Sequence, residues 1–426
     1  MAIDLKKRVY ASKAKSGSVI LAGWAQDIQI LGKLAFITLR DASGQALLVV
    51  KSDLKNFKEL SNLNRESVIS IKGKIQKSKS KKFNKEILVG ELEILNKAEP
   101  LPIEFSGKVD TSLDKRLDWR FIDLRNPKIN AIFKIQAQVS QSFREFFIKE
   151  GFTEFWPPEI IEAAPEGGAD LFTVDYFESK AYLAQSPELY KEICTGTDFE
   201  KVFCIIPIWR AEKHNTIKHL NEIRQMDIEA AFKDQHSIID YLDRCVKYIV
   251  KDVLKKCKEE IKLLNPKLKV PQTKKLSYKQ VIDSLNKHKF KVKYGDDLSP
   301  DAEKKLAEIY GENTLVFIHS WPTSQKPFYI MTKDGKISEG FDADYGGLEI
   351  ASGGQRIHDP ELLKERLKDK GLNVKDFKFF IDSLKYGIPP HAGWSIGLER
   401  LTMIICGLKN IREACLFPRD RSRLLP

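Results

Sequence analysis

The residues best suited to chemistry in this chain lie in one run, PIWRAEKHNTIKHLNEIRQMDIEAAF over residues 207–232. Arg210 and Glu212 stand near its start, and His219 lies in the polar stretch that follows. A guanidinium is always charged and offers a fork of donors that fits phosphate or carboxylate oxygens. An arginine held beside a carboxylate under a basic loop therefore suits a phosphate-bearing substrate. Taken alone, the same pattern is also typical of an ordinary surface hairpin.

Two later stretches carry related chemistry. Residues 348–356 read LEIASGGQR, and residues 397–400 read GLER. Neither G-x-x-x-x-G-K-[ST] nor G-x-G-x-x-G is found, so the standard phosphate-binding loops do not account for the chain. The three stretches therefore have to be weighed together with the elements that position them.

Short β segments predict a small barrel at the start of the chain. Apolar runs at 19–24, 34–40, 46–50, 68–73 and 87–95 are separated by turn signals. Five such strands favour a barrel of the oligonucleotide-binding (OB) kind, whose face stacks unpaired bases. Phe36 is then either a stacking platform or a core aromatic. The lysine-rich run 77–85 is either a phosphate-contacting loop or a solvated hairpin tip.

The pattern changes after residue 97. Residues 101–126 have prolines, mixed charge and no sustained period, so we expect a hinge. Asn126-Pro127 then supplies a helix start, and apolar residues continue at helical spacing to a stop at Gly151. That wide apolar face serves either a core or a subunit interface.

The remaining elements are mixed. We expect a helix over 238–264, core strands over 328–331 and 348–351, and helices that open at Asp359-Pro360 and at Gly397. The lysine-rich stretch 266–311 is expected to be a peripheral insertion. Strands and helices do not alternate regularly, which favours an α+β fold with an antiparallel sheet flanked by helices.

Composition narrows the class of protein. A chain of 426 residues with a net charge of +12 predicts two or three domains and a polyanionic partner, nucleic acid first. The six cysteines form no C-x-x-C pair, so we expect free thiols in a reducing compartment. Neither an apolar signal core nor a membrane-spanning run is present, so we expect a cytoplasmic protein without a membrane partner.

Six separated segments resemble one family. They read APEGGADLF, AQSPELYKE, RAEKHNTIKHLNE, GLEIASGGQRIHD, YGIPPHAGWSIGLERLTM and NIREACLFPRDRSRLLP. Together they look like the class II aspartyl-tRNA synthetases of the archaeal and eukaryotic type. Pro158 matches the first class II motif, 210–229 the second and 397–400 the third. Gly23-Trp24 and FITLRD resemble the family's N-terminal barrel, so the resemblance covers essentially the whole chain.

The resemblance implies a fold and an activity. The fold would be an OB-fold anticodon-binding domain over 1–100, a linker over 101–126 and a class II catalytic domain over 127–426. The activity would be ATP-dependent ligation of L-aspartate to tRNA(Asp) through an aspartyl-adenylate, with Mg²⁺ as cofactor and a homodimer formed through 127–158. Charging of tRNA(Asn) as well stays open, as do an asparaginyl-tRNA synthetase and an RNA-binding paralogue that charges no tRNA.

The resemblance also implies roles for individual residues. Arg210 and Arg400 would be catalytic, on the α- and γ-phosphates of ATP. Glu349 and Ser352 would hold Mg²⁺. Aspartate would be bound by Glu166, Gln185, Ser186, Glu188, Lys191, Arg210, Ser352 and Arg356. ATP would be bound by Arg210, Glu212, Lys218, His219, Leu220, Glu349, Gly397, Leu398, Glu399 and Arg400. Gln26, Phe36 and Gln45 would face the anticodon.

Charge favours aspartate over asparagine as the substrate. A buried second carboxylate needs a fixed cationic partner, and Lys191 and Arg356 match the two family positions that supply it. Two departures bear on this reading. Glu188 stands where the family usually has glutamine, which adds negative charge beside the substrate. In the barrel, Leu47 replaces a glutamine that reads the central anticodon base, while Gln45 lies two residues earlier.

Overall fold

The computed structural model describes residues 3–107, 109–162, 171–213 and 216–426, in two compact units, Met1–Thr111 and Ser112–Pro426. This division differs from the expected linker over 101–126, because residues 113–118 and 120–123 are helical and belong to the second unit. Arg120 gives the physical reason. Its buried guanidinium donates to the carbonyl oxygens of Cys415 (2.9 Å) and Leu416 (3.0 Å), which ties this segment to the end of the chain.

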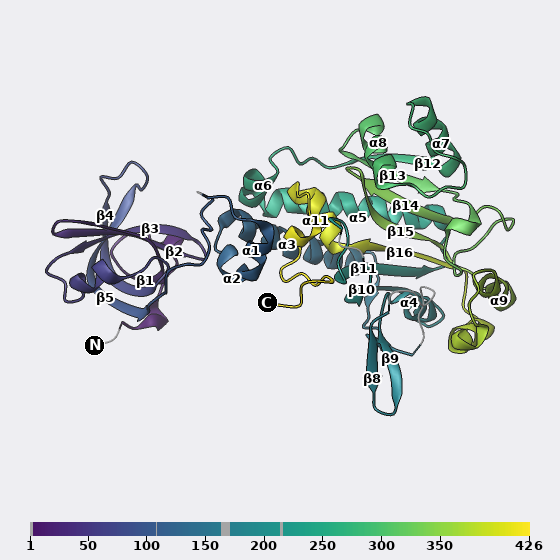
Figure 1. Ribbon diagram of the computed structural model, residues 1–426, viewed down its shortest axis with the longest axis horizontal. Coiled ribbons are helices and arrows are strands. Elements are labelled where there is room, and N and C mark those ends of the chain that lie inside the picture. Colours follow the sequence, from purple (N-terminus) through teal and green to yellow (C-terminus); the bar gives the residue numbers. More distant parts are fainter. Residues whose placement is uncertain (1–2, 108, 163–170, 214–215) are drawn as a thin grey trace. The chain divides into compact units, whose positions relative to one another are not determined.

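The first unit is a closed five-stranded barrel, as the sequence predicts (Figure 1). Its strands follow the order β1-β2-β3-β5-β4, and alternate residues of β2 face the core, where Ile37 and Leu39 are fully buried. Gly23 allows β1 to approach β2 closely, because a Cβ there would lie 2.2 Å from the carbonyl oxygen of Arg40. The strands are β1 (Ser18–Leu31), β2 (Leu34–Asp41), β3 (Gly44–Lys51), β4 (Val68–Lys77) and β5 (Lys85–Asn96), with 3-10 turns at Leu5–Lys7, Ala11–Lys13 and Phe57–Asn62.

The second unit is built on an eight-stranded sheet in the order β12-β13-β14-β15-β16-β11-β10-β6, and Figure 1 shows the strands from β12 to β10 side by side. The outer pairs β12–β13 and β10–β6 are parallel, and the inner pairs are antiparallel, as predicted. The strands are β6 (Thr153–Glu154), β10 (Lys201–Trp209), β11 (Glu222–Ala231), β12 (Gln272–Ser277), β13 (Thr314–His319), β14 (Gly340–Tyr345), β15 (Leu348–Gln355) and β16 (His391–Gly397).

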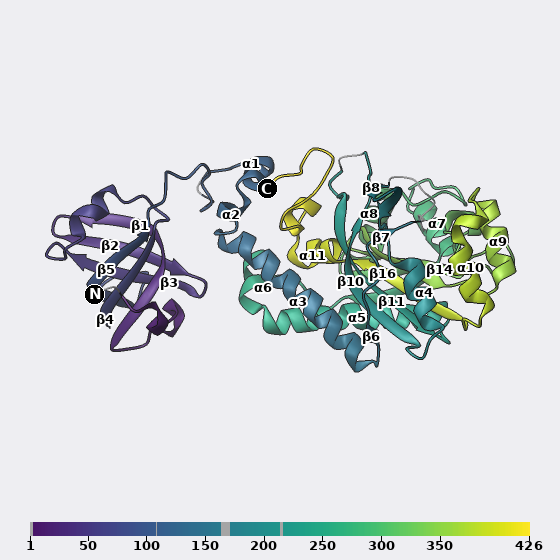
Figure 2. The same cartoon turned by 90° about the horizontal axis from the view of Figure 1, so that it is seen from below.

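Three helices, α3 (Pro127–Lys149), α5 (Gln235–Lys256) and α11 (Leu398–Cys406), pack with one face of this sheet into a single core (Figure 2). The side chain of Asn126 caps α3 by accepting from the amide of Lys128 at 2.8 Å, as its position before Pro127 predicts. Phe147 lies with its ring centroid 5.6 Å from that of Trp394 on β16. Because this face is filled by helices, polar residues that alternate with the core residues must emerge on the opposite face.

Smaller elements surround the sheet. They are α1 (Leu113–Asp118), α2 (Arg120–Asp123), α4 (Glu188–Thr195), α6 (Lys258–Leu264), α7 (Tyr278–Lys287), α8 (Pro300–Tyr310), α9 (Pro360–Asp369) and α10 (Lys378–Lys385), the 3-10 turns Thr323–Gln325, Val374–Phe377 and Ile411–Ala414, and a three-stranded sheet of β7 (Ile160–Ile161), β8 (Thr173–Tyr176) and β9 (Ser179–Leu183). No helix in the described ranges is long and apolar enough to cross a membrane. All six cysteines are free thiols.

Three expectations about individual elements need correction. The helix expected over 238–264 is divided at Cys257 into α5 and α6. Residues 328–331 are buried but make an isolated bridge, Ile330 to Arg356, rather than a strand. The stretch 266–311 is not simply peripheral, because β12 forms the edge of the main sheet while α7 and α8 cover its last strands with a core of their own.

Candidate active site

A row of polar residues crosses the sheet face opposite the helices. Asp227 on β11 pairs with Ser395 on β16, Ser395 with Ser352 on β15, and Ser352 with Asp342 on β14. The hydroxyl of Ser395 donates to the Asp227 carboxylate at 3.2 Å. This row forms the floor of the candidate site, since its members come from four adjacent strands.

A β-bulge brings the two expected metal ligands onto that floor. Glu349 pairs with Asp344 and Ala351 with Ala343, so Ile350 is an extra residue on β15. Ile350 and Ala351 both lie in the helical core. Glu349 and Ser352, which a regular strand would place on opposite faces, therefore share the open face.

The expected amino acid pocket is a buried ionic cluster. The Nζ of Lys191 lies 2.9 Å from Glu188, 3.0 Å from Asp227 and 3.7 Å from Glu229. Arg356 donates from Nε and Nη2 to both oxygens of Glu229, at 3.0 and 3.1 Å, and its Nη2 lies 2.6 Å from Glu188. The two predicted cations are thus brought together, and each has carboxylate partners from this chain.

Two opposing effects set the pKa values in the cluster: burial disfavours the charged form of each group, and ion pairing favours it. Burial alone would raise the pKa of Glu188, but Arg356 and Lys191 outweigh it and hold the pKa below its usual range. Burial raises the pKa of Asp227 to about 6, with Lys191 opposing the shift. Burial would likewise lower the pKa of Lys191, but Glu188 and Asp227 reverse the direction and keep the ammonium charged.

A buried histidine–carboxylate pair lies next to the cluster. His391 Nε2 is 3.1 Å from Glu192, and its Nδ1 is 2.8 Å from the carbonyl oxygen of Pro389. A carbonyl only accepts, so Nδ1 carries a proton and Nε2 meets the carboxylate, with a second proton shared between them. Burial raises the pKa of Glu192 to about 7, against the opposing effect of His391.

Gly393 is required by this packing. A Cβ at that position would lie 2.0 Å from Glu229 Oε2 and 2.2 Å from the carbonyl oxygen of Ile228. We expect Gly393→Ala to destabilise the protein by about 2–3 kcal/mol and to weaken amino acid binding, because Glu229 positions Arg356. The midpoint of urea unfolding measures the first effect. Gly90→Ala is the control, since its nearest neighbour would be 3.7 Å away; equal losses in the two variants would contradict the assignment.

A second cavity, of about 210 Å³, lies on the same open face toward β14 and β15, where Asp342 and Glu349 line it. Arg400 is anchored there by donating from Nη1 to the carbonyl oxygen of Glu349 at 2.8 Å, and its Nη2 lies 3.4 Å from His219 Nε2. Because arginine only donates, Nε2 is the acceptor, and Nδ1–H then donates to Thr216 at 2.7 Å. Burial, followed by the charge of Arg400, lowers the pKa of His219. The cavity therefore presents a fixed cation beside a neutral imidazole.

The acidic residues of this cavity fit a hard divalent cation. Asp344 has a buried Oδ2 that accepts no hydrogen bond from any described residue, and burial together with nearby carboxylates raises its pKa. The Glu349 side chain keeps 41% exposure toward the cavity, yet burial by the cavity walls and the Asp342 carboxylate raise its pKa to about 7. No cluster of three or more metal-ligating side chains occurs among the described residues. Oxygen ligands in such small number suit Mg²⁺, which completes its shell with phosphate and water.

Arg210 follows the last residue of β10. Its backbone pairs with Asn221, which donates from Nδ2 to the Arg210 carbonyl oxygen at 2.6 Å. Its guanidinium makes no hydrogen bond or ion pair with any described residue. The charge is therefore available to a ligand. Glu212 accepts at its backbone oxygen from the same Asn221 side chain, at 3.1 Å.

Several other predicted ATP contacts already have structural partners. Lys218 is paired with Glu303 at 2.7 Å. The Glu399 carboxylate accepts from the backbone amide of Arg224 at 3.0 and 3.2 Å. Leu220 packs in a buried cluster, so a nucleotide could meet only its backbone. Leu398 is buried, and Gly397 precedes α11. Glu166 lies outside the described residues.

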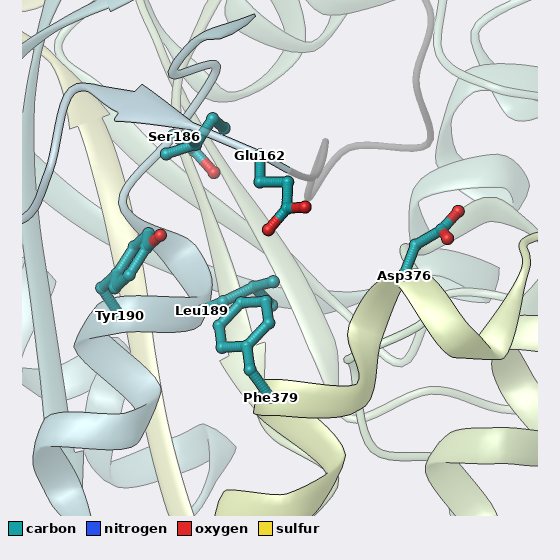
Figure 3. Close-up of a pocket in the computed structure, with 7 residues that line it drawn as sticks. Glu162, Ser186, Leu189, Tyr190, Asp376 and Phe379 are labelled. Carbon is teal, nitrogen blue, oxygen red and sulfur yellow. The ribbon is translucent and has the colours of Figure 1, made fainter. Parts of the chain in front are cut away.

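Gln185 and Ser186 are buried beside the cluster, where they lead into α4. Ser186 also lines a further cavity of about 200 Å³, whose walls are Leu189, Tyr190 and Phe379 (Figure 3). Glu162 and Asp376 also line this cavity, and Figure 3 shows the Glu162 carboxylate among the other labelled side chains. Free volume thus borders the first turn of α4.

On the barrel, two of the three expected anticodon residues are joined. Gln45 donates from Nε2 to Gln26 Oε1 at 2.7 Å. Phe36 is half-buried at an outward position of β2, between the buried Ala35 and Ile37. Leu47, which stands where the family usually has a glutamine, is buried. Gln45 is therefore the exposed glutamine of β3.

Sequence reasoning missed four participants. Asp227 and Glu229 were visible as alternating polar residues on a strand, and that alternation was the signal that could have found them. Glu192 and His391 are 199 residues apart in the sequence, so no local pattern could predict that they form a pair.

The chain is similar to known proteins along nearly its whole length. Residues 112–421 match a family described as tRNA synthetases class II (D, K and N), and residues 19–95 match an OB-fold nucleic acid binding domain. The chain is 46% identical over 417 residues to an aspartate–tRNA(Asp) ligase of Picrophilus torridus, covering 96% of this chain and 97% of the relative. It is 44% identical over 431 residues to an aspartate–tRNA(Asp/Asn) ligase of Archaeoglobus fulgidus, covering 98% and 100%.

Among solved structures, asparaginyl-tRNA synthetase from Pyrococcus horikoshii complexed with asparaginyl-adenylate is similar, with a TM-score of 0.94 and 33% identity over 98% of this chain and 99% of that one. A putative aspartyl-tRNA synthetase from Leishmania major matches with a TM-score of 0.89 and 28% identity, over 100% and 96% of the two chains.

Proposed function

The chain belongs to the class II tRNA synthetases of the D, K and N group, and from this membership we propose that it ligates L-aspartate to tRNA(Asp) with ATP, through an aspartyl-adenylate. The observation that carries the proposal is the likeness over nearly the full length to ligases named for aspartate, at 46% identity in the Picrophilus torridus relative. Lys191 and Arg356, buried in one pocket with three carboxylates of this chain, would be the cations that pair with an aspartate side chain.

Charging of tRNA(Asn) is a second candidate activity, favoured by the relative from Archaeoglobus fulgidus that is named for both tRNAs. Asparagine as the amino acid is less well supported. The likeness to asparaginyl-tRNA synthetase structures concerns a fold that the whole group shares, whereas the pocket of this chain holds two buried cations. A paralogue without charging activity would have no need of the guanidinium groups of Arg210 and Arg400 for binding phosphates.

In the proposed first step, the α-carboxylate of aspartate attacks the α-phosphate of ATP and pyrophosphate leaves. Arg210 would hold the α-phosphate as its charge grows, and Arg400 would hold the γ-phosphate. The neutral His219 imidazole would keep Arg400 in position by accepting from it at Nε2. No general base is needed, because the attacking carboxylate is already ionised.

Glu349 and Ser352 would hold Mg²⁺ on the open face of the sheet. When bound, the ion supplies positive charge to the phosphate oxygens. Asp342 is held by Lys326, whose Nζ lies 2.6 Å from its Oδ1, so Lys326 would limit the negative charge of the site where the phosphates arrive.

Two further features stay predictions. A homodimer through 127–158 is supported by exposed apolar side chains on that segment, since Ile148 is 60% and Trp156 is 80% exposed. The anticodon would meet the barrel face that carries Gln26, Phe36 and Gln45.

Pyrophosphate exchange tests the proposed function. Purified protein with Mg²⁺ is expected to exchange labelled pyrophosphate into ATP with aspartate, and far more slowly with asparagine, because a neutral amide cannot take the place of a carboxylate as partner of the two cations. Parallel charging of tRNA(Asp) and tRNA(Asn) transcripts then separates the two tRNA candidates. Absence of aspartate-dependent exchange would exclude the proposal, and faster exchange with asparagine would favour the asparaginyl alternative.

A further inference from the structure

The carboxylate of Glu188 bridges the two cations of the amino acid pocket. Its Oε2 lies 2.9 Å from Lys191 Nζ, and its Oε1 lies 2.6 Å from Arg356 Nη2. The three side chains are almost fully buried, at 6%, 0% and 2% exposure. A carboxylate of this chain thus takes the position between the two cations.

Three carboxylates of this chain surround the ammonium group of Lys191. Its Nζ lies within hydrogen-bond distance of Glu188 and Asp227, at 2.9 and 3.0 Å, and Glu229 is 3.7 Å away. Three carboxylates already face two cations, so the side chain of aspartate would add a fourth negative charge. A substrate carboxylate could reach both cations only if one resident carboxylate moved away.

Glu188 is the resident carboxylate best able to move. Asp227 is fixed on a central strand and accepts from Ser395 at 3.2 Å. Glu229, also on that strand, is held by two hydrogen bonds from Arg356. Glu188 is instead the first residue of the eight-residue helix α4, and its chain neighbours Ser186 and Leu189 line the cavity in Figure 3.

We propose that Glu188 is an internal competitor for the aspartate side chain: it occupies the subsite of the substrate's β-carboxylate in the empty protein and must be displaced when aspartate binds. This proposal rests on the proposed function, since it takes aspartate as the substrate. Glu188 thereby sets the affinity for the amino acid without altering the cavity lined by Glu349 and Arg400, which lies on the same open face toward β14 and β15.

Glu188→Gln tests the proposal, because glutamine keeps the size of the side chain and removes its charge. Two cations would then face two carboxylates, so the pocket is balanced and the variant is expected to fold. The dissociation constant for aspartate is expected to fall roughly tenfold, because repulsion between like charges is relieved, while the KM for ATP is unchanged. Asp376→Asn is the matched control, since it removes a negative charge at the neighbouring cavity without touching either cation.

Succinate separates this role from binding of the substrate's ammonium group, because it has two carboxylates and no ammonium. Calorimetry is expected to show that Glu188→Gln binds succinate and aspartate more tightly by similar factors. Weaker or unchanged binding of both, with wild-type exchange intact, would overturn the proposal and leave the proposed function standing. Weaker aspartate binding with unchanged succinate binding would also overturn it and assign Glu188 to the ammonium. If the wild-type protein lacks aspartate-dependent exchange, the proposed function fails, and succinate binding still decides whether Glu188 occupies the subsite.

Discussion

Arg210→Ala is expected to lower the rate of aspartyl-adenylate formation by about 10²–10³-fold or more, the loss typical of removing one preorganised group that stabilises a transition state. Stability should be unchanged, because the guanidinium has no hydrogen bond or ion pair to a described residue. Removal of the Arg210 guanidinium therefore leaves no buried carboxylate without a partner, so no stability is lost for that reason. Pyrophosphate exchange at saturating aspartate and ATP measures the rate, and urea unfolding measures the stability.

Arg244→Ala provides the control for that experiment. Arg244 lies on α5, behind the opposite face of the sheet, where it pairs with Glu150 at 2.6 Å. Exchange by this variant should match the wild type. Retention of full exchange by the Arg210 variant would show that another group holds the α-phosphate.

Arg356→Gln is expected to have two effects of different kinds. It leaves Glu188 and Glu229 buried without their guanidinium, and breaking a buried pair by removing one partner costs about 3–5 kcal/mol of stability. It also removes one of the two cations of the aspartate pocket, so the KM for aspartate should rise by on the order of 100-fold, with little change in the KM for ATP. Urea unfolding and exchange kinetics at varied aspartate and ATP measure the two effects.

A second variant separates the causes of these losses. In Glu188→Gln with Arg356→Gln, Lys191 faces two carboxylates instead of three. Part of the lost stability should therefore return, while aspartate binding stays weak. Equal rises in the KM values for aspartate and ATP in the single variant would contradict a role for Arg356 in the amino acid pocket.

Local signals predicted much of the fold. The start of α3 could be predicted because Asn126 caps it and Pro127 fits the first turn, and its end because Gly151 has a left-handed conformation, with φ at 78°. The segment 328–331 could not be assigned correctly, because burial alone does not distinguish a strand from an irregular segment that packs beneath Arg356. Residues 112–126 were misjudged because Arg120 acts through contacts with the distant end of the chain.

The sequence analysis named the two cations of the candidate site and Glu188, but it did not assign Asp227 or Glu229 to the site. Lys191 and Arg356 were found because they stand in recognisable motifs. The presence of two cations favours aspartate over asparagine, because a buried second carboxylate needs a cationic partner. In the structure, however, Glu188, Asp227 and Glu229 outnumber the cations, and only the register of β11 beside α4 reveals it. The preference for aspartate therefore depends on how these partners rearrange, not on a count of lysine and arginine.

The bulge at Ile350 has a consequence for protein design. Two oxygen ligands three residues apart are ordinarily a helical arrangement, because on a regular strand they would point in opposite directions. Grafting Glu349 and Ser352 onto another sheet would therefore require copying the extra residue and the strand that pairs around it, or else resetting the spacing to two. Transfer of the two side chains alone would not reproduce the site, because the irregular backbone is what places them on the same face.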